Sequence, residues 1–195
     1  MYTLWHEKLL LYRLHHERDP DAFGELYDRY APKIYRYIYF KVSGRTEVED
    51  LTAEVFLKTW EYVQRHAEDE TKRIKNFRAF VYRLARNLVV DHYRERTERE
   101  LLADEATLER VPVPDEQHML TAISRSSDLA MVERALRNLK DEYRELVVLR
   151  YIEGLSTVDI ARITDKTKGT VRVTLHRALI ALKEEVEKMD SQVKS

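Results

Sequence analysis

The 195-residue chain contains no cysteine, and glycine and proline occur only four times each. The absence of cysteine excludes disulfide bonds, thiolate zinc sites and cysteine nucleophiles. The scarcity of glycine and proline, beside many Leu, Glu, Arg and Ala residues, favours a nearly all-helical chain. We therefore expect an all-α protein.

Long hydrophobic runs are also missing. No apolar stretch approaches the roughly eighteen residues that a membrane span needs. The N-terminal segment MYTLWHEKLLLYRLHHERD carries charges where a signal peptide would be apolar. We therefore expect no membrane insertion and a cytoplasmic location. The length and the 44% hydrophobic content suffice for one domain or two small ones, each with its own core.

The sequence lacks the usual marks of catalysis and of metal binding. It has no glycine-rich phosphate loop and no nucleophile motif. Two of its seven histidines, His15 and His16, are adjacent and point to different sides of a helix, and the others are scattered. We expect neither enzymatic activity nor catalytic residues, and no metal or cofactor.

The formal net charge of −1 conceals an uneven distribution along the chain. Residues 71–99 hold 9 basic and 3 acidic residues, net +6, and residues 165–183 hold 5 and 1, net +4. Residues 17–70, with 13 acidic and 8 basic, and 100–128, with 7 acidic and 2 basic, are each net −5. Separated basic patches of this kind indicate phosphate binding even in a neutral molecule.

Apolar periodicity predicts helices through the first half of the chain. A short helix is expected over residues 4–16. Asp19 is a candidate N-cap for the next helix, Pro32 marks a break or a first-turn position in it, and Ser43-Gly44 ends it. A further helix opens near residues 46–50.

A polar loop, residues 67–75, precedes the stretch FRAFVYRLARNLVVDHYRER, which packs five arginines and four aromatic residues into twenty positions. Its apolar stripe at helical spacing consists of Phe77, Phe80, Val81, Leu84, Ala85 and Leu88. The opposite face carries Tyr82, Arg83, Arg86, Val90, Tyr93 and Arg94. This alternation of guanidinium groups and rings fits an anionic, stackable ligand; the alternative is a solvated basic face on a structural helix.

Residues 100–128 are acidic and weakly periodic, with Val-Pro-Val-Pro at 111–114, which indicates a linker. From residue 129 onward the apolar pattern resumes and predicts four more helices. The chain therefore divides into two small helical domains joined by an acidic linker.

The last two predicted helices have a helix-turn-helix layout. Ser156 can cap the first, residues 164–166 form a short polar break, and Thr167 can cap the second. The second helix is predicted to present outward Lys168, Thr170, Arg172, Thr174, His176 and Arg177. The basic second helix favours DNA binding, although any helical hairpin can mimic this spacing.

Five segments, taken in order, resemble the compact extracytoplasmic-function type of bacterial sigma factor over about residues 21–188. DAFGELYDRYAPKIYRYI is similar to that family's opening helix, DLTAEVFLKTW to its polymerase-binding helix and FRAFVYRLARNLVVDHYRER to its promoter-melting helix. YRELVVLRYIEGLSTVDIA and GTVRVTLHRAL resemble its reader of the minus-thirty-five element.

The resemblance implies an architecture of two domains, a sigma region 2-like helical bundle and a sigma region 4-like helix-turn-helix domain. The expected parts are an N-terminal extension (1–20), the region 2-like domain (21–99), the acidic linker (100–128), the region 4-like domain (129–188) and a tail (189–195). The linker would lie in the polymerase's RNA exit path or serve as a solvated tether.

The resemblance also implies sites. The polymerase-binding candidates are Asp50, Leu51, Glu54, Val55, Leu57, Lys58 and Trp60. Phe56 and Trp60 fit the core as well as an interface. The minus-ten candidates are Tyr82, Arg83, Arg86, Asn87, Asp91, Tyr93 and Arg94. In this set the rings would stack on unpaired bases, the arginines would neutralise phosphates, and Asp91 would orient Arg94 from i to i+3. The family's pocket for a flipped base would fall near residues 68–76.

The minus-thirty-five candidates are Lys168, Thr170, Arg172, Thr174, His176 and Arg177, which the major groove can accommodate. Two departures from the family pattern fall in the turn, where Asp165 replaces a usual glycine and Lys166 a usually apolar residue. Asp tolerates positive φ better than most residues, so we expect the turn to form. Thr174 stands where arginine is frequent.

The function implied is that of a sigma factor, which binds core RNA polymerase and directs promoter recognition and transcription initiation. Its partners would be core RNA polymerase, promoter DNA as duplex and as melted single strand, and an anti-sigma factor. The alternatives are a free-standing helix-turn-helix regulator and a sigma-like decoy that binds an inhibitor. The arginines of both basic patches argue against a decoy, which has no use for them.

Overall fold

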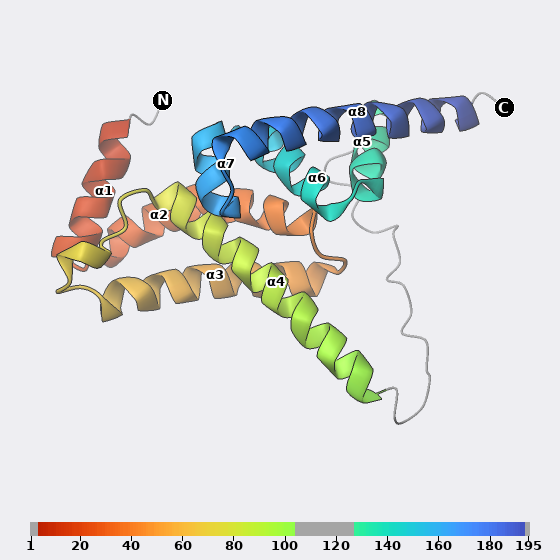
Figure 1. Ribbon diagram of the computed structural model, residues 1–195. Coiled ribbons are helices and arrows are strands. Elements are labelled where there is room, and N and C mark those ends of the chain that lie inside the picture. The colour runs from red at the N-terminus through yellow and green to blue at the C-terminus, as the bar shows by residue number, and fades with distance from the viewer. Residues whose placement is uncertain (1–3, 104–126, 194–195) are drawn as a thin grey trace. The chain divides into compact units, whose positions relative to one another are not determined.

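The computed structural model describes residues 4–103 and 127–193, and every regular element in these ranges is helical (Figure 1). The elements are α1 (Leu4–His16), α2 (Pro20–Tyr39), α3 (Arg45–Arg65), the 3₁₀ turn η1 (Glu70–Lys72), α4 (Phe77–Ala103), α5 (Ser127–Asn138), α6 (Asp141–Val147), the π turn η2 (Val148–Ile152), α7 (Thr157–Thr164) and α8 (Lys168–Val193). The prediction of an all-α protein is confirmed. None of these helices is both long enough and apolar enough to cross a membrane.

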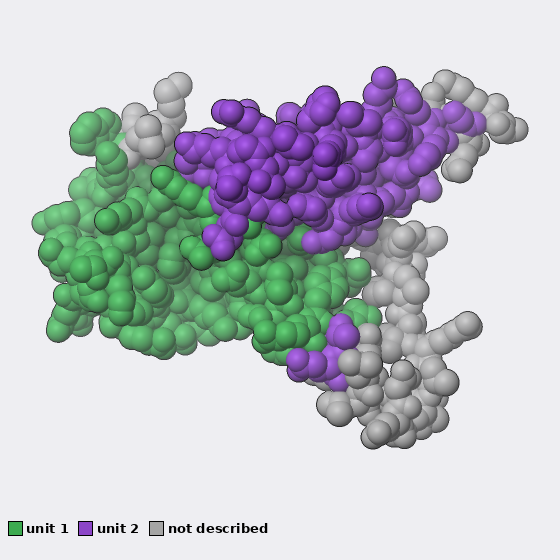
Figure 2. Space-filling view, in the orientation of Figure 1, with its two compact units in different colours: residues 1–96, 162–164 green, residues 97–161, 165–195 purple. Residues whose placement is uncertain are grey.

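The chain divides into two compact units, residues 1–96 with 162–164 and residues 97–161 with 165–195 (Figure 2). Most of the linker predicted at 100–128 lies outside the described residues. Most of α7, residues 157–161, belongs to the second unit.

The core of the first unit forms where α2 meets α3 and α4. One face of α2 is buried along its whole length, through Ala22, Leu26, Tyr30, Ile34, Tyr37, Ile38 and Tyr39. Aromatic pairs join α2 to α4: the ring of Tyr30 lies 5.4 Å from that of Phe77, and the ring of Tyr37 lies 5.6 Å from that of Tyr82. Such pairs add roughly 0.5–1.5 kcal/mol each beyond the area they bury.

Asp19 caps α2 as predicted, because its carboxylate accepts hydrogen bonds from the N–H groups of Asp21 (2.9 Å) and Ala22 (3.4 Å). The break or first-turn position predicted at Pro32 is wrong, since α2 continues through it to Tyr39. Proline removes one backbone donor from the helix and leaves the carbonyl of Asp28 without its usual partner. Asp28 is exposed, so water can satisfy that carbonyl.

The connection from α2 to α3 depends on Gly44. Its φ of +145° is a conformation that side-chain-bearing residues rarely adopt, and α3 begins at the next residue. Within α3, the buried hydroxyls of Thr52 and Thr59 donate to the carbonyls one turn earlier, at 2.6 and 2.7 Å. These bonds allow α3 to bury a continuous face against α2.

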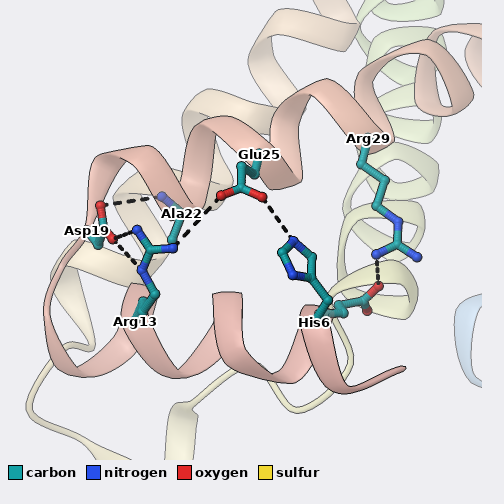
Figure 3. A network of polar contacts seen from close by, with 7 residues as sticks. His6, Arg13, Asp19, Ala22, Glu25 and Arg29 are labelled. Atoms are coloured by element: carbon teal, nitrogen blue, oxygen red, sulfur yellow. Dashed lines mark hydrogen bonds and ion pairs between the residues drawn. The ribbon is translucent and has the colours of Figure 1, made fainter. Parts of the chain in front are cut away.

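α1 packs on α2 and belongs to the first unit. Leu10, Leu11 and Leu14 are buried on its inner face. Outside this apolar contact, a set of ion pairs links the two helices (Figure 3). Burial of the leucines supplies most of the stabilisation, because exposed ion pairs contribute little.

In the second unit, α5 and α6 pack against α8. α6 leads directly into the π turn η2, and Gly154, with φ +64°, ends this segment. The Arg150 guanidinium donates to the Leu155 carbonyl at 2.8 Å, which fixes the path of the chain into α7. The four predicted helices are confirmed, with the second built from α6 and η2.

Candidate nucleic-acid interface

The polar face of α4 carries most of the predicted nucleic-acid contacts. Arg83, Asn87 and Arg94 are exposed, while Arg86 is half-buried. The Arg94 guanidinium lies 3.3 Å from the Asp91 carboxylate, as predicted from their i to i+3 spacing. This pair limits the orientations of Arg94 while leaving most of its side chain in solvent.

Tyr82 does not lie on this face, and its predicted role in base stacking is wrong. Its side chain is fully buried, with the ring edge-on to Tyr37 of α2 at an interplanar angle of 76°. The buried face of α4 is rotated relative to the predicted stripe, since it includes Tyr82 and Val89, while Phe80 and Leu84 of that stripe are only half-buried. Tyr82 is therefore a core residue, unable to reach a nucleic-acid base.

Tyr93 is 40% exposed, and its orientation is set by a contact that the sequence did not reveal. Its hydroxyl donates a 2.6 Å hydrogen bond to the carbonyl of Lys41, which follows the end of α2. The hydroxyl end of the ring is thereby fixed, while part of the ring remains accessible to solvent. An aromatic ring held in this way can stack on a base with little loss of side-chain entropy.

The loop before α4 contains the region predicted to hold a flipped base, residues 68–76. Hydrogen bonds from the Thr71 hydroxyl (2.6 Å) and N–H (3.0 Å) hold the pKa of Asp69 below its ordinary value. An open hollow of about 490 Å³ lies beside the loop and is lined by Arg18, Gln64, Arg65, Ala67, Glu68, Asp69 and Glu70. The Asn76 side chain accepts from Ala79 N–H at 2.9 Å and so caps α4.

The candidate set on α3 divides between surface and core. Asp50, Leu57 and Lys58 are exposed, and the half-buried Glu54 pairs with Lys58 at 3.0 Å. Leu51 and Val55 are buried, so their assignment to an interface is wrong. They lie on the buried face of α3, where a helix must bury its apolar residues.

Phe56 and Trp60, which the sequence assigned equally to the core or to an interface, differ in burial. Phe56 is buried, with its ring edge-on to Tyr27 at 4.8 Å. Trp60 is half-buried and lies against Phe23 at 5.0 Å, which leaves part of the indole accessible. Phe56 is a core residue, whereas Trp60 lies where core meets surface.

The helix-turn-helix of the second unit has the helix caps predicted from the sequence. Ser156 accepts from Asp159 N–H at 3.1 Å, and Thr167 accepts from Thr170 N–H at 3.1 Å. Asp165 ends α7 in the left-handed conformation, φ 55° and ψ 41°, as expected for the residue that replaces glycine. Lys166, which replaces an apolar residue, pairs with Glu142 of α6 at 2.7 Å. This ion pair gives Lys166 a place on the surface of the unit.

On α8, five of the six predicted contact residues are exposed: Lys168, Thr170, Arg172, His176 and Arg177. Thr174 is only 9% exposed, and its predicted outward position is wrong. It lies one turn from the buried Val171 and Ala178, on the side that packs into the unit. The sequence pattern missed Val173, whose side chain is 52% exposed among the polar residues and can contact an apolar groove atom such as a thymine methyl.

Comparisons with known proteins match both units. The family model for Sigma-70 region 2 matches residues 26–99, and the model for Sigma-70 region 4 matches residues 129–182. These matches cover the helices that carry the two exposed basic faces.

Several curated relatives match over most of the chain. The ECF RNA polymerase sigma factor BldN of Streptomyces coelicolor is 36% identical over 170 residues, 84% of this chain and 60% of BldN. SigW of Bacillus subtilis is 28% identical, covering 86% of this chain and 90% of SigW. SigD of Mycobacterium bovis is 30% identical, covering 86% of this chain and 78% of SigD.

Solved structures share the fold. The sigma factor RpoE from Bartonella quintana, determined with the anti-sigma factor NepR, has a TM-score of 0.65 at 24% identity and covers 85% of this chain and 96% of its own. CnrH, determined with the cytosolic domain of CnrY, has a TM-score of 0.67 at 21% identity. The match covers 94% of this chain and 98% of the CnrH chain. On the family models and the curated relatives, the chain belongs to the ECF RNA polymerase sigma factors.

Proposed function

We propose that the chain binds core RNA polymerase and directs promoter recognition and transcription initiation. The observation that carries this proposal is the presence of two separate exposed basic helix faces, on α4 and on α8, each held by its own capped helical unit. One face suits unpaired bases and the other suits duplex DNA. A free-standing helix-turn-helix regulator would need only the second.

The α4 face is the proposed site for the minus-ten element and for strand opening. Arg83 and Arg94 would contact phosphates, Asn87 would hydrogen-bond a nucleotide, and Tyr93 would stack on an unpaired base. The half-buried Arg86 would add positive charge at the edge of the face. The loop at residues 68–76 would receive a flipped base beside this surface.

The exposed part of α3 is the proposed contact with core polymerase. Leu57 is 58% exposed and flanked by charged residues, among them Lys58 and Glu54. An apolar side chain ringed by polar groups is the usual arrangement at the centre of a protein contact. Asp50 and Trp60 would extend this contact along the helix.

The exposed face of α8 is the proposed reader of the minus-thirty-five element. Arg172 and Arg177 can contact base edges or phosphates, and Lys168 lies at the first helical position, nearest a docked backbone. Thr170 and His176 complete the polar surface. Val173 adds a wholly apolar side chain to this surface.

The domain boundaries, a further partner and the cellular location are proposed from the same family membership. The chain would comprise the region 2-like domain at residues 21–99, the linker at 100–128 and the region 4-like domain at 129–188, after an N-terminal extension and before a short tail. An anti-sigma factor is a further proposed partner. Because core polymerase and promoters lie in the bacterial cytoplasm, we place the protein there, and its proposed role requires no catalytic step of its own.

Transcription in vitro tests the proposal directly. Sheared genomic DNA from the source organism would be transcribed by core bacterial polymerase with and without the protein, and the RNA 5′ ends would be sequenced. We expect new start sites that share two spaced upstream elements. An absence of new starts, with a core enzyme that is active with another sigma factor, would contradict the proposal, and duplex binding without polymerase would then favour a free-standing regulator.

A further inference from the structure

One hydrogen bond joins the N-terminal helix to the loop that precedes α4. His15, near the end of α1, is 7% exposed, and its Nε2 lies 3.0 Å from the backbone nitrogen of Ile74. The two residues are 59 positions apart in the chain. Since a backbone N–H can only donate, the imidazole nitrogen is the acceptor, and the ring is neutral with its proton on Nδ1.

α1 is a firm base for this contact, because its buried leucines pack against α2 and polar side chains join the two segments around that apolar contact (Figure 3). The Arg13 guanidinium donates to the Asp19 carboxylate at 2.8 Å, and His6 meets Glu25 at 3.0 Å. Beyond the ion pairs, Leu14 is fully buried beside His15 in the sequence. The imidazole is therefore attached to an element that has little freedom to move.

The loop is also held by contacts at its surface, among them a hydrogen bond from the Thr71 hydroxyl to Asp69 at 2.6 Å. The Tyr62 hydroxyl donates to the Lys72 carbonyl at 2.9 Å, and Arg73 reaches both Glu70 (3.0 Å) and His16 (3.1 Å). Those groups are largely on the surface. The buried attachment consists of the Ile74 side chain, 6% exposed, together with its N–H on His15.

The position of Ile74 bears directly on the candidate site. Only Lys75 separates it from Asn76, which caps α4. Consecutive Cα atoms are about 3.8 Å apart, so a displacement of Ile74 must change the loop at 68–76 or the start of α4. A buried N–H that loses its acceptor costs free energy, so the hydrogen bond to His15 favours the loop conformation in which Ile74 stays in place.

We propose that α1 is a working part of the strand-opening unit, in which His15 is a positioning residue that holds the loop at 68–76 in the conformation that receives promoter DNA. The inference rests on the proposed function, since it assigns that loop to the minus-ten site. His15 acts through Ile74 and touches no nucleotide. The N-terminal extension thereby contributes to promoter opening as well as to stability.

Three variants of the full chain test this inference. His15→Leu keeps a buried side chain but removes the acceptor, and His15→Gln restores an acceptor oxygen. Leu10→Ala is the matched control, because Leu10 is equally buried on α1 but lies more than one turn from His15. For each variant we would measure amide exchange at Ile74, thermal stability, and strand opening by permanganate reactivity in complex with core polymerase.

We expect His15→Leu to accelerate exchange at Ile74 and to lower strand opening by about tenfold, the effect expected when a buried donor loses its partner. His15→Gln should restore most of the slow exchange at Ile74 and most of the strand opening. Leu10→Ala should lower thermal stability, but below the melting temperature of this variant it should open DNA as the unchanged protein does. The inference is overturned if His15→Leu opens DNA normally, or if Leu10→Ala loses as much opening. Failure of the unchanged protein to open any promoter would instead refute the proposed function, and the inference with it.

Discussion

The hydroxyl of Tyr93 on α4 donates a 2.6 Å hydrogen bond to the carbonyl oxygen of Lys41, just past the end of α2. The two residues are 52 positions apart, and this contact fixes a partly exposed aromatic ring beside the arginines of α4. The ring is thus oriented before any nucleic acid binds, which reduces the entropy that stacking would cost.

The first prediction concerns this ring. Tyr93→Ala should weaken binding of a single-stranded promoter oligonucleotide to the polymerase complex by about 1–3 kcal/mol, the usual worth of one stacked base. Tyr93→Phe keeps the ring but loses its hydrogen bond, so its affinity for the oligonucleotide should lie between those of the unchanged protein and Tyr93→Ala. Fluorescence anisotropy measures the affinities. Tyr151→Ala, at an exposed tyrosine of the second unit, is the control. An equal loss of oligonucleotide affinity in this variant would contradict stacking by Tyr93.

Tyr82 should behave in the opposite way. Because its side chain is fully buried against Tyr37, Tyr82→Ala should lower the free energy of unfolding by about 3–5 kcal/mol through the cavity it leaves. Chemical denaturation followed by circular dichroism gives this value. A variant that unfolds like the unchanged protein yet binds promoter DNA poorly would show that Tyr82 contacts DNA after all.

On α8, Arg172 and Thr174 provide a contrast between neighbouring positions. Arg172 is exposed and Thr174 is buried. Arg172→Ala should weaken duplex binding and, if the side chain contacts a phosphate, reduce the slope of log affinity against log salt by about one. Thr174→Ala should leave that slope unchanged. Titrations of the minus-thirty-five duplex at several salt concentrations measure both slopes, and an altered slope in Thr174→Ala would contradict its placement.

A fourth prediction follows from the titration of His15. Burial lowers the pKa of this imidazole, and the positive charge of the nearby Arg73 acts in the same direction. A lowered folded-state pKa means that the neutral form is favoured on folding. The stabilisation is therefore complete above the ordinary pKa of 6.5 and is lost as the pH falls from there through the lowered value.

Unfolding free energies measured across this pH range would show the effect. The unchanged protein should lose more stability on acidification than His15→Gln, whose side chain does not titrate. Parallel curves for the two proteins would indicate that protonation of His15 is not coupled to folding.

Features set by local sequence were predicted well. Asp19, Ser156 and Thr167 were identified as helix caps because a side chain that accepts from the first turn needs only its immediate neighbours. The left-handed conformation of Asp165 and the pairing of Asp91 with Arg94 are equally local. The order of the helices followed from apolar periodicity for the same reason.

Features that depend on a tertiary partner were not predictable from the pattern alone. Tyr82 and Thr174 lie at the borders of apolar stripes, and which side they face depends on how broadly the neighbouring helix packs. Leu51 and Val55 belong to an apolar helix face that could equally meet a partner protein, and only their burial in the structure assigns them to the core. The contacts of Tyr93 with Lys41 and of His15 with Ile74 join residues too distant in sequence to leave a pattern.

The most direct test of the account separates strand opening from polymerase binding. A double variant, Arg83→Ala with Asn87→Ala, removes two exposed groups of the α4 face, and Arg45→Ala at the start of α3 is the control. Affinity for core polymerase and permanganate reactivity at a promoter would be measured for each. We predict that the double variant binds polymerase normally but fails to open the promoter, and that the control does both. Equal loss of binding and opening, or normal opening, would contradict the assignment of the α4 face to melted DNA.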